Sequence, residues 1–475
     1  MFINEKLQEF ERYIFNKKVA LIGLGVSNIP LIDYFIEKGA HVTVFDNRNI
    51  DEIDPEVVSK ITSQCVRFSF GKHNLVNLVG FDLIFRSPTC RPDSPELIAE
   101  SIRGAIITSE IEMVLDLCPG KVIGVTGSDG KTTTSSLIYE ILKEKGFDCY
   151  LGGNIGTPLF TKIEEMKPDC FVVLELSSFQ LMGIKSSPDI SVITNISPNH
   201  LDFHKNYEEY IDSKKNIYRF QKENGKLILN YDNEMTRYLL PEVKGTVRYF
   251  SSKTKLENGI IYDNGIIKTC NDGVRMHILH VDDALSIHGI HNYENICAAI
   301  AATEGLVEPA IQARAITKFK GVEHRLEYVR NIKGVKWYND SIGTSPTRTI
   351  AGLNSFKQKV TLIAGGYDKQ LDYTCIGKPI VEKVNKLILV GTTADKIENA
   401  VKEQLAINKT NLPIYRCENL EECILKAYEL TNEGEIVLFS PASASFDMFK
   451  NFEERGEKFK ELVFKLERDN LRNNA

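Results

Sequence analysis

The sequence predicts an α/β protein of three domains. Short apolar runs typical of strands alternate with helical patterns along nearly the whole chain, as in proteins with mostly parallel sheets. A chain of 475 residues is also long enough for about three domains of ordinary size. Two glycine-rich turns, near residues 23 and 127, each lie between a predicted strand and a predicted helix, which indicates two separate strand–turn–helix units. We place the domains at residues 1–107, 108–320 and 321–475.

The composition is that of an ordinary globular protein. Hydrophobic residues make up 43% of the chain, and the formal net charge is −6, so nothing favours a nucleic-acid or anionic-membrane partner. No apolar run approaches the roughly 20 residues that span a bilayer. The ten cysteines form no C-x-x-C pair, which indicates reduced thiols. We expect a cytoplasmic monomer that binds neither nucleic acid nor membrane.

The first block, "KKVALIGLGVSNIPLIDYFIEKGAHVTVFD", predicts a strand, a glycine turn, a helix and a second strand. It supplies Gly23-x-Gly25, but Asn28 stands where the dinucleotide fingerprint has its third glycine. Asp46 ends the second strand, about where a ribose-binding acid would be. Three interpretations stay open: a site for NAD, a site for the diphosphate of a nucleotide sugar, and a purely structural turn.

The second block contains the strongest motif, "VIGVTGSDGKTTTSSL". Its Gly-Lys-Thr follows a strand and opens a helix, so backbone N–H groups and the helix dipole can hold phosphate oxygens. The common phosphate loop would place a glycine at position 125, where this chain has valine. The predicted nucleotide-binding residues are Gly127, Ser128, Asp129, Gly130, Lys131, Thr132 and Thr133. A hydroxyl of Thr132 or Thr133 can reach Mg²⁺.

Several polar residues follow this loop. Glu175 ends the apolar strand of "VVLELSSFQ", and His200 lies beyond the strand "SVITNIS". At the sheet edge expected for Lys131, a carboxylate and an imidazole favour a Mg²⁺ site, although a lone histidine is often structural. Asn295 lies one turn inside a predicted helix, where a capping role does not explain it. Arg325 and Asp340 suit a clamp on a nucleotide near the second domain junction.

The third block contains the strand-like runs "VTLIAGG", "KLILVG" and "EIVLFS". The last run is followed by "SPASASFDMFKNFEERG", where we expect a helix that begins at Ser445. The positive end of such a helix would favour an anion at this serine.

Taken together, these motifs resemble the Mur ligases of bacterial peptidoglycan synthesis, and among them the branch that adds D-glutamate. The similarity extends over essentially the whole chain. It is carried by "GVTGSDGKTTT", "GGNIGTPL", "LELSSFQL", "NISPNHLD", "GIHNYENICAA", "GVEHR", "YNDS", "AGGYDK" and "SPASASFDMFKNFEERG". The Asp-Asn-Pro-Arg motif of the diaminopimelate- and lysine-adding ligases is absent. The resemblance implies a Rossmann-like UDP-binding domain, a central P-loop ATPase-type domain and a C-terminal Rossmann-like domain.

The resemblance also implies the chemistry and its residues. ATP would phosphorylate the carboxylate of UDP-N-acetylmuramoyl-L-alanine, and the amine of D-glutamate would displace the phosphate. Two Mg²⁺ ions are expected. Lys131, Glu175, His200 and Lys214 would be catalytic, and Thr132, Glu175, His200 and a carbamylated Lys214 would hold metal, with Lys215 as the alternative lysine. Asn295, Arg325 and Asp340 would bind ATP. The substrate residues would be Val26, Ser27, Asn47, Arg48 and Asn154 for the UDP compound, and Thr344, Lys369, Ser445 and Phe452 for D-glutamate.

The chain departs from the family pattern in two places. Ile342-Gly343-Thr344-Ser345 stands where many members have Lys-Ala-Thr-Asn, so a lysine contact is lost. In "SPTCRP", Thr89 and Cys90 stand where a glycine is usual after Ser-Pro. The rival functions are a sibling ligase, a folylpolyglutamate-synthase-like enzyme, an NAD-dependent oxidoreductase and a phosphate-loop protein that only hydrolyses ATP.

Overall fold

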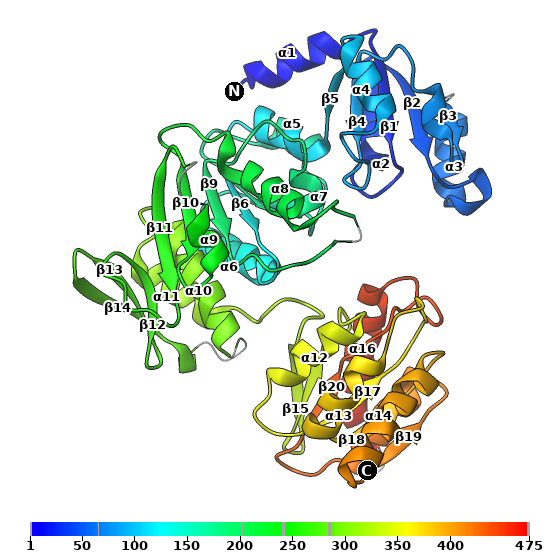
Figure 1. The fold of residues 1–475 in the computed structure, drawn as a ribbon, viewed down its shortest axis with the longest axis vertical. Helices are drawn as coiled ribbons and strands as arrows, with labels where there is room; N and C mark the ends of the chain where they lie inside the picture. The colour runs from blue at the N-terminus through cyan, green and yellow to red at the C-terminus, as the bar shows by residue number, and fades with distance from the viewer. Residues whose placement is uncertain are drawn as a thin grey trace. The chain divides into compact units, whose positions relative to one another are not determined.

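A computed structural model describes residues 2–64, 66–201, 203–239, 243–283, 287 and 289–472 of the chain, with side chains up to residue 466. These residues form three sheets with helices packed against them, coloured in chain order in Figure 1. The predicted α/β class with three sheet-containing domains is confirmed. The chain divides into two compact units, one within residues 1–318 and one made chiefly of residues 319–475. The first two sheets share the first unit, so the boundary near 107 stays a prediction.

The first sheet has five parallel strands in the order β3-β2-β1-β4-β5. The strands are β1 (Lys18–Ile22), β2 (His41–Asp46), β3 (Arg67–Phe70), β4 (Leu83–Arg86) and β5 (Ile106–Thr108). The helices are α1 (Glu5–Ile14), α2 (Ile29–Glu37), α3 (Pro55–Ser63), α4 (Pro95–Ile102) and α5 (Glu110–Leu117). The central strand β1 is apolar on both faces because helices cover parallel sheets on both sides. The predicted strand–turn–helix–strand of the first block is confirmed.

The second sheet has nine strands in the order β14-β13-β12-β11-β10-β9-β6-β8-β7. The strands are β6 (Lys121–Thr126), β7 (Cys149–Gly153), β8 (Phe171–Glu175), β9 (Ile190–Ile193), β10 (Lys226–Asn230), β11 (Thr246–Ser251), β12 (Gly259–Asp263), β13 (Ile266–Asn271) and β14 (Val274–His280). Strand β13 pairs antiparallel with both β12 and β14, and the other strand pairs described in this sheet are parallel. The helices are α6 (Lys131–Lys145), α7 (Ser178–Leu181), α8 (Tyr207–Arg219), α9 (Glu234–Tyr238), α10 (Ile290–Thr303) and α11 (Pro309–Lys318).

The position of β6 in this sheet decides where a site can form. Strand β6 pairs in parallel with β8 on one side and with β9 on the other. Because the carboxyl ends of parallel strands lie at one edge of a sheet, Thr126, Glu175 and Ile193 end at the same edge. The polar residues that follow these three strands are therefore brought to one place.

The third sheet has the order β15-β16-β20-β17-β18-β19, and only β15 and β16 pair antiparallel. The strands are β15 (Glu327–Ile332), β16 (Val335–Asn339), β17 (Val360–Ala364), β18 (Val384–Leu389), β19 (Ile414–Arg416) and β20 (Ile436–Phe439). The helices are α12 (Pro346–Asn354), α13 (Gly377–Lys383), α14 (Ala394–Asn408), α15 (Leu420–Leu430) and α16 (Phe452–Arg472). The three strands predicted in the third block correspond to β17, β18 and β20.

The first two sheets share one apolar core, which explains why they belong to one unit. Phe160, in the connection between β7 and β8 of the second sheet, packs edge-on against Tyr34 of α2, with ring centroids 4.9 Å apart. In the second unit the wholly buried Trp337 lies against Phe459 of α16. Within the described residues, no helix combines the length and the apolarity that a membrane crossing requires.

Candidate active site

The glycine-rich loop connects β6 to α6. Gly130 lies just before the helix in the left-handed region, with φ +80°, and a Cβ there would overlap Oδ1 of Asn295. A Cβ at Gly127 would overlap Oγ1 of Thr194. These two positions therefore require glycine, and the displaced glycine spacing follows from the side chains that pack against the loop.

The loop is held by residues that lie far from it in the chain. Ser128 Oγ lies 2.8 Å from the hydroxyl of Tyr210, and Asn195 Oδ1 accepts a 2.9 Å bond from the Asp129 N–H. Thr134 Oγ1 donates to Asn295 Oδ1 at 3.3 Å. Asn295 thus lies inside α10, as the sequence predicts, and the structure adds that it packs against the loop and helps to fix its shape.

The two predicted lysines meet at one carbonyl oxygen. Lys131 Nζ donates to the carbonyl oxygens of Gly127 and Ser128, each at 3.0 Å. Lys214 Nζ, from α8, donates to the same Gly127 oxygen at 3.0 Å and to Thr126 Oγ1 at 3.2 Å. Thr132 and Thr133 lie in the first turn of α6, half-buried and buried respectively.

Lys214 is buried, with 1% of its surface exposed. Burial lowers its pKa well below the usual value, and the nearby positive charge of Lys131 lowers it further. No carboxylate among the described residues lies within ion-pair distance of its amine, which favours the neutral form. The neighbouring Lys215 is half-buried. Of the two lysines, Lys214 is the one whose side chain reaches the phosphate loop.

Glu175 ends β8 with 1% of its surface exposed. Its Oε1 accepts a 2.8 Å bond from Asn154 Nδ2. Its Oε2 is buried and has no hydrogen-bond partner among the described residues. An orphaned carboxylate oxygen at the edge where the phosphate loop lies is suited to bind a cation.

His200 lies in the loop after β9, exposed and in the left-handed region with φ +54°. Its ring lies edge-on to Phe179 at the start of α7, with centroids 4.9 Å apart. Phe179 also contacts the rings of Phe203 and His204. This aromatic group orients the His200 segment toward α7, which directly follows Glu175-Leu176-Ser177.

Sequence reasoning missed a polar chain beside this group. The buried His204 lies 2.9 Å from Ser178 Oγ and 3.7 Å from a carboxylate oxygen of Glu209. Glu209 is bound by the guanidinium of Arg91, which also donates to the carbonyl oxygen of Phe203 at 3.0 Å. Arg91 belongs to the loop "SPTCRP" of the first sheet, 118 residues from Glu209, so no local pattern could have indicated the contact.

Of the predicted UDP residues, Val26 and Ser27 lie in the first glycine turn, and Asn47 and Arg48 directly follow β2. Asp46 is buried, accepts a 2.7 Å bond from the Leu24 N–H and forms an ion pair with Arg48. Its pKa is held below the usual value by these hydrogen bonds despite the opposing effect of burial. Because this carboxylate is already bound, a ribose-binding role of the NAD type is disfavoured. Val26 and Asn47 are exposed, and Ser27 is half-buried.

Asn28, which replaces the third glycine, has a structural explanation. Its Nδ2 donates to the carbonyl oxygens of Ile22 and Gly23 at 2.9 and 3.0 Å, and only 2% of its surface is exposed. These bonds hold the turn closed at the position where the third glycine of the fingerprint would serve close packing of helix and strand.

Arg325 and Asp340 belong to the second unit, so their position relative to the phosphate loop is not described. Asp340 is buried: its carboxylate accepts a 2.6 Å bond from Ser440 Oγ and a 3.2 Å bond from the Leu326 N–H. Burial raises the pKa of Asp340 to about 6. Asp340 thereby fixes the backbone beside the half-buried Arg325.

The predicted amino-acid residues come from separate loops of the second unit. Lys369 is exposed and lies over the ring of Phe446, with Nζ 5.2 Å from the ring centre. Ser445 is buried, with 2% of its surface exposed. Thr344 and Phe452 are half-buried.

The expectation that a helix begins at Ser445 is wrong. Helix α16 begins at Phe452, because Asn451 Oδ1 accepts the Glu454 N–H at 2.8 Å in the manner of an N-cap. Ser445 instead begins a turn, in which its carbonyl oxygen accepts from Met448 and Phe449. The helix-dipole argument for an anion at Ser445 therefore does not hold.

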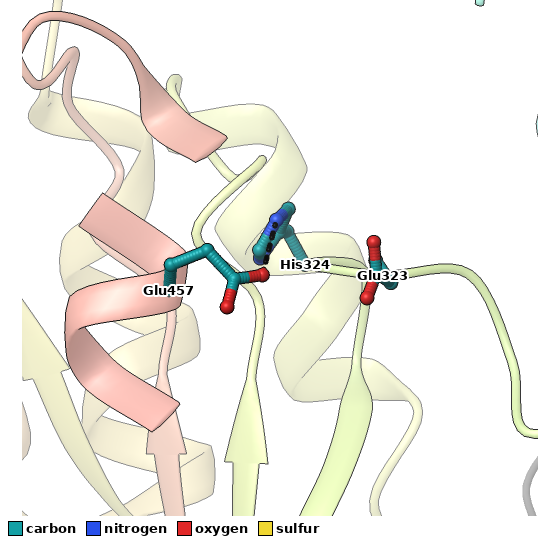
Figure 2. A group of neighbouring side chains, drawn as sticks. All are labelled: Glu323, His324 and Glu457. Carbon is teal, nitrogen blue, oxygen red and sulfur yellow. Dashed lines mark ion pairs between the residues drawn. The ribbon is translucent and has the colours of Figure 1, made fainter. Parts of the chain in front are cut away.

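A second group of titratable residues lies near Arg325. Figure 2 shows Glu323 and His324, at the start of the second unit, and Glu457 of α16, whose ligand atoms all lie within 4.8 Å of one another. Lys460 Nζ lies 2.6 Å from Glu457 and 3.3 Å from Glu323. An ammonium group therefore already occupies the place that a cation would take.

The tautomer of His324 also argues against a metal at this group. Asn339 Oδ1 accepts from the Ser341 N–H at 3.1 Å, which fixes Nδ2 of Asn339 as the atom that donates to Nδ1 of His324 at 3.0 Å. The neutral imidazole then carries its proton on Nε2, the nitrogen 3.6 Å from Glu457. We therefore assign this group as an ion-pair cluster that ties the first residues of the unit to α16.

Three family models match consecutive parts of the chain. They are "Mur ligase MurD-like, N-terminal domain" over residues 17–109, "Mur ligase middle domain" over residues 125–303, and "Mur ligase, glutamate ligase domain" over residues 324–443. Together they extend over most of the sequence and follow the order of the three sheets.

Curated relatives match at nearly full length. Proteins named UDP-N-acetylmuramoylalanine--D-glutamate ligase from Acetivibrio thermocellus and Ruminiclostridium cellulolyticum are 49% and 50% identical, over 98% of this chain and all of theirs. The protein of that name from Clostridium tetani is 46% identical over the same shares.

Solved structures share the fold at low identity. The UDP-N-acetylmuramate-alanine ligase MurC of Thermotoga maritima matches with a TM-score of 0.58 and 18% identity, over 94% of this chain and 98% of that one. The MurF ligase of Thermotoga maritima in complex with ADP matches with a TM-score of 0.54 and 18% identity, over 96% of each chain.

Proposed function

Because this chain belongs to the Mur ligase family, we propose that it joins D-glutamate to UDP-N-acetylmuramoyl-L-alanine at the expense of ATP. The observation that carries the proposal is the identity of 46–50%, over almost all of both chains, with relatives that bear this activity in their name. The product would be a precursor of the peptidoglycan cell wall. The cytoplasm is the expected compartment, and we expect the enzyme to act as a monomer.

The proposed reaction must activate a carboxylate before an amine can attack it. A carboxylate is a poor acceptor for an amine because an oxide ion is a poor leaving group. Transfer of the γ-phosphoryl group of ATP to the substrate carboxylate gives an acyl phosphate and ADP. The amine of D-glutamate then attacks the acyl carbon, loses a proton, and the tetrahedral intermediate expels phosphate to leave an amide.

The phosphate loop would bind ATP through its backbone N–H groups and the start of α6. Lys131, whose amine lies at the base of the loop, would neutralise charge on the transferring phosphoryl group. Asn295 supports the proposal because it packs against Gly130 and so keeps the loop open for phosphate. Arg325 and Asp340 would act on the nucleotide from the second unit.

The residues at the sheet edge fit Mg²⁺. The orphaned Oε2 of Glu175 is a hard oxygen donor, and the hydroxyl of Thr132 and the ring of His200 would complete a donor set. Bound Mg²⁺ would supply positive charge for the oxygens of the phosphoryl group. Asn154, predicted to contact the UDP substrate, orients Glu175 through its amide and would link the two sites.

Lys214 suits carbamylation. Carbamate formation requires a neutral amine, which attacks the carbon of CO₂ and loses a proton. The buried amine of Lys214, with its pKa far below the usual value, meets that requirement. The resulting carboxylate would join Glu175 and His200 as a metal ligand and would offset the positive charge of Lys131.

The remaining residues would bind the two organic substrates. The uracil and diphosphate would bind near the first glycine turn, at a site formed by Val26, Ser27, Asn47 and Arg48. Lys369 would pair with a carboxylate of D-glutamate, and Thr344, Ser445 and Phe452 would complete the pocket. Lys369 is suited to this task because it is exposed and held over an aromatic ring.

The experiment that tests the proposal is phosphate release with UDP-N-acetylmuramoyl-L-alanine, ATP and a panel of D- and L-amino acids. We expect release only with the UDP substrate and D-glutamate together. Release with D-alanine, L-lysine or diaminopimelate instead would identify a sibling ligase. Release without any amine would identify a hydrolase and would contradict the proposal.

A further inference from the structure

Arg455 is among the largest side chains that the second unit buries completely. Only 1% of its surface is exposed, and it lies in the first turn of α16. No carboxylate among the described residues forms an ion pair with it, and Asp447 acts on it only at longer range. A buried guanidinium without a paired anion is rare because removing the charge from water is costly. Its retention therefore requires an explanation.

The guanidinium joins the loops that carry the proposed amino-acid pocket. Its Nε donates to Ser341 Oγ at 3.0 Å, and one Nη donates to the Ser341 carbonyl oxygen at 2.8 Å. The other Nη donates to the carbonyl oxygens of Ser443 and Ala444 at 3.1 and 2.8 Å. Ser341 lies three residues before Thr344, and Ala444 directly precedes Ser445.

The same contacts reach the other two pocket residues. The Ala444 carbonyl oxygen also accepts from the Tyr367 N–H at 2.9 Å, two residues before Lys369. Ser341 Oγ donates to the carbonyl oxygen of Phe452 at 2.8 Å. One side chain is therefore linked, directly or through Ser341 and Ala444, to the backbone near all four predicted pocket residues. It does this with a planar fork of donors that lysine does not have.

The charge has a second consequence. Burial lowers the pKa of Arg455 to about 10, so the group stays protonated at neutral pH. Every hydrogen-bond acceptor it has among the described residues is a neutral oxygen, and its other contact is with the ring of Phe439, 5.9 Å from the guanidinium carbon to the ring centre. Asp447 acts on it without forming an ion pair. The field of this cation is therefore only partly cancelled within the protein, and it would act on an anion bound near these loops.

We propose that Arg455 is a positioning residue that sets the selectivity of the pocket for an acidic amino acid. It fixes the backbone that carries Thr344, Lys369, Ser445 and Phe452. Its buried positive charge favours an amino acid with two carboxylates over one with an uncharged side chain. The inference rests on the proposed function and adds a residue that touches no substrate.

The test compares Arg455→Met and Arg455→Lys with the whole wild-type enzyme. Arg455→Met removes the charge, and Arg455→Lys keeps the charge but loses the fork. For each we would measure the KM for D-glutamate, the KM for ATP, and turnover with hydroxylamine in place of the amino acid. Hydroxylamine attacks the acyl phosphate as a small neutral amine, forms a hydroxamate and expels phosphate, so it does not need the pocket.

We expect the KM for D-glutamate to rise about 10–100-fold in Arg455→Met, the size of effect seen when a residue that orients a metal ligand is removed. The rise should be smaller in Arg455→Lys. The KM for ATP and hydroxylamine turnover should stay within about twofold of wild type. Lys458→Met, a half-exposed lysine in the next turn of α16, is the matched control and should change none of them.

Two results would overturn the inference. One is an unchanged KM for D-glutamate in either folded variant. The other is an equal loss of D-glutamate-dependent and hydroxylamine-dependent turnover, which would mean a general role in folding. If Arg455→Met does not fold, Arg455→Lys decides. If the wild-type enzyme prefers a neutral amino acid, both this inference and the proposed function are contradicted. If the wild-type enzyme uses D-glutamate and the two variants are unaffected, only the inference about Arg455 is contradicted.

Discussion

The side-chain amide of Asn154 donates a 2.8 Å hydrogen bond to Oε1 of Glu175 and leaves Oε2 of that carboxylate buried without a partner. The bond fixes the direction in which the free oxygen points. Asn154 comes from the end of β7 and Glu175 from the end of β8, which are neighbouring strands. The arrangement is that of a metal ligand oriented by a supporting hydrogen bond.

Asn154→Ala should therefore weaken the response to Mg²⁺. We expect the Mg²⁺ concentration that gives half-maximal activity to rise about 10–100-fold, because an unsupported ligand costs that much in metal affinity. The measurement is activity against Mg²⁺ at saturating ATP. Asn408→Ala, at an exposed position in α14, is the control. An unchanged Mg²⁺ dependence would remove Glu175 from the proposed metal site.

The parts of this arrangement that lie in local sequence could be predicted. A strand followed by Gly-Lys-Thr defines the phosphate loop, and a carboxylate at the end of an apolar run marks Glu175. Parallel strand ends meet at one edge, so their convergence follows from the fold class alone. The local sequence could not decide whether Lys214 or Lys215 faces the phosphate loop, because this depends on which face of α8 is buried.

The remaining features depend on contacts between distant segments. Asn295 packs closely against Gly130, 165 positions away in the chain. Arg91 likewise bonds to Glu209, 118 positions away. Helix α16 begins later than the sequence predicts because the side chain of Asn451, and not that of Ser445, accepts a free N–H group of its first turn, that of Glu454. Both residue types are good N-caps, so local preference does not choose between them.

Lys214→Ala should lose activity and regain part of it with added short carboxylic acids such as acetate. The truncation leaves space beside the Gly127 carbonyl oxygen, where a small carboxylate can replace the carbamate. Activity would be measured with and without the acid. Lys215→Ala should keep its activity. Lys214→Ala without rescue would leave carbamylation unsupported.

Lys131→Ala should lower ADP formation by more than about 100-fold, because a cation on the transferring phosphoryl group is lost. The assay is ADP production at saturating substrates. Lys121→Ala, at the exposed first residue of β6, is the matched lysine control. Retained turnover in Lys131→Ala would overturn the phosphate-loop assignment.

Ser445→Ala should raise the KM for D-glutamate about 10–100-fold, which corresponds to one hydrogen bond to a charged group. The KM for ATP should change little. Both constants would be measured beside Ser355→Ala, at an exposed serine of the same unit. Equal changes in both KM values would argue against Ser445 as a pocket residue.

Asp340→Asn should stabilise the protein at neutral pH. Burial raises the pKa of this carboxyl from the usual 3.8 to about 6, so the folded state binds the proton more tightly than the unfolded state. Between these two values the unfolded state releases its proton first, and the free energy of unfolding falls as the pH rises. Above the folded pKa the ionised carboxylate costs about 3 kcal/mol, a cost that asparagine avoids.

The difference in stability between Asp340→Asn and wild type should therefore be small near pH 4, grow up to pH 6, and stay constant above it. Denaturant unfolding at several pH values measures it. Asp372→Asn is the control of opposite sign: the exposed Asp372 has a lowered pKa, because it accepts hydrogen bonds from Thr374, and its removal should destabilise most at high pH. A difference for Asp340→Asn that does not vary with pH would contradict the assignment. If the variant is more stable but less active, the ionised carboxylate is retained for its charge beside Arg325, because stability alone would have favoured asparagine.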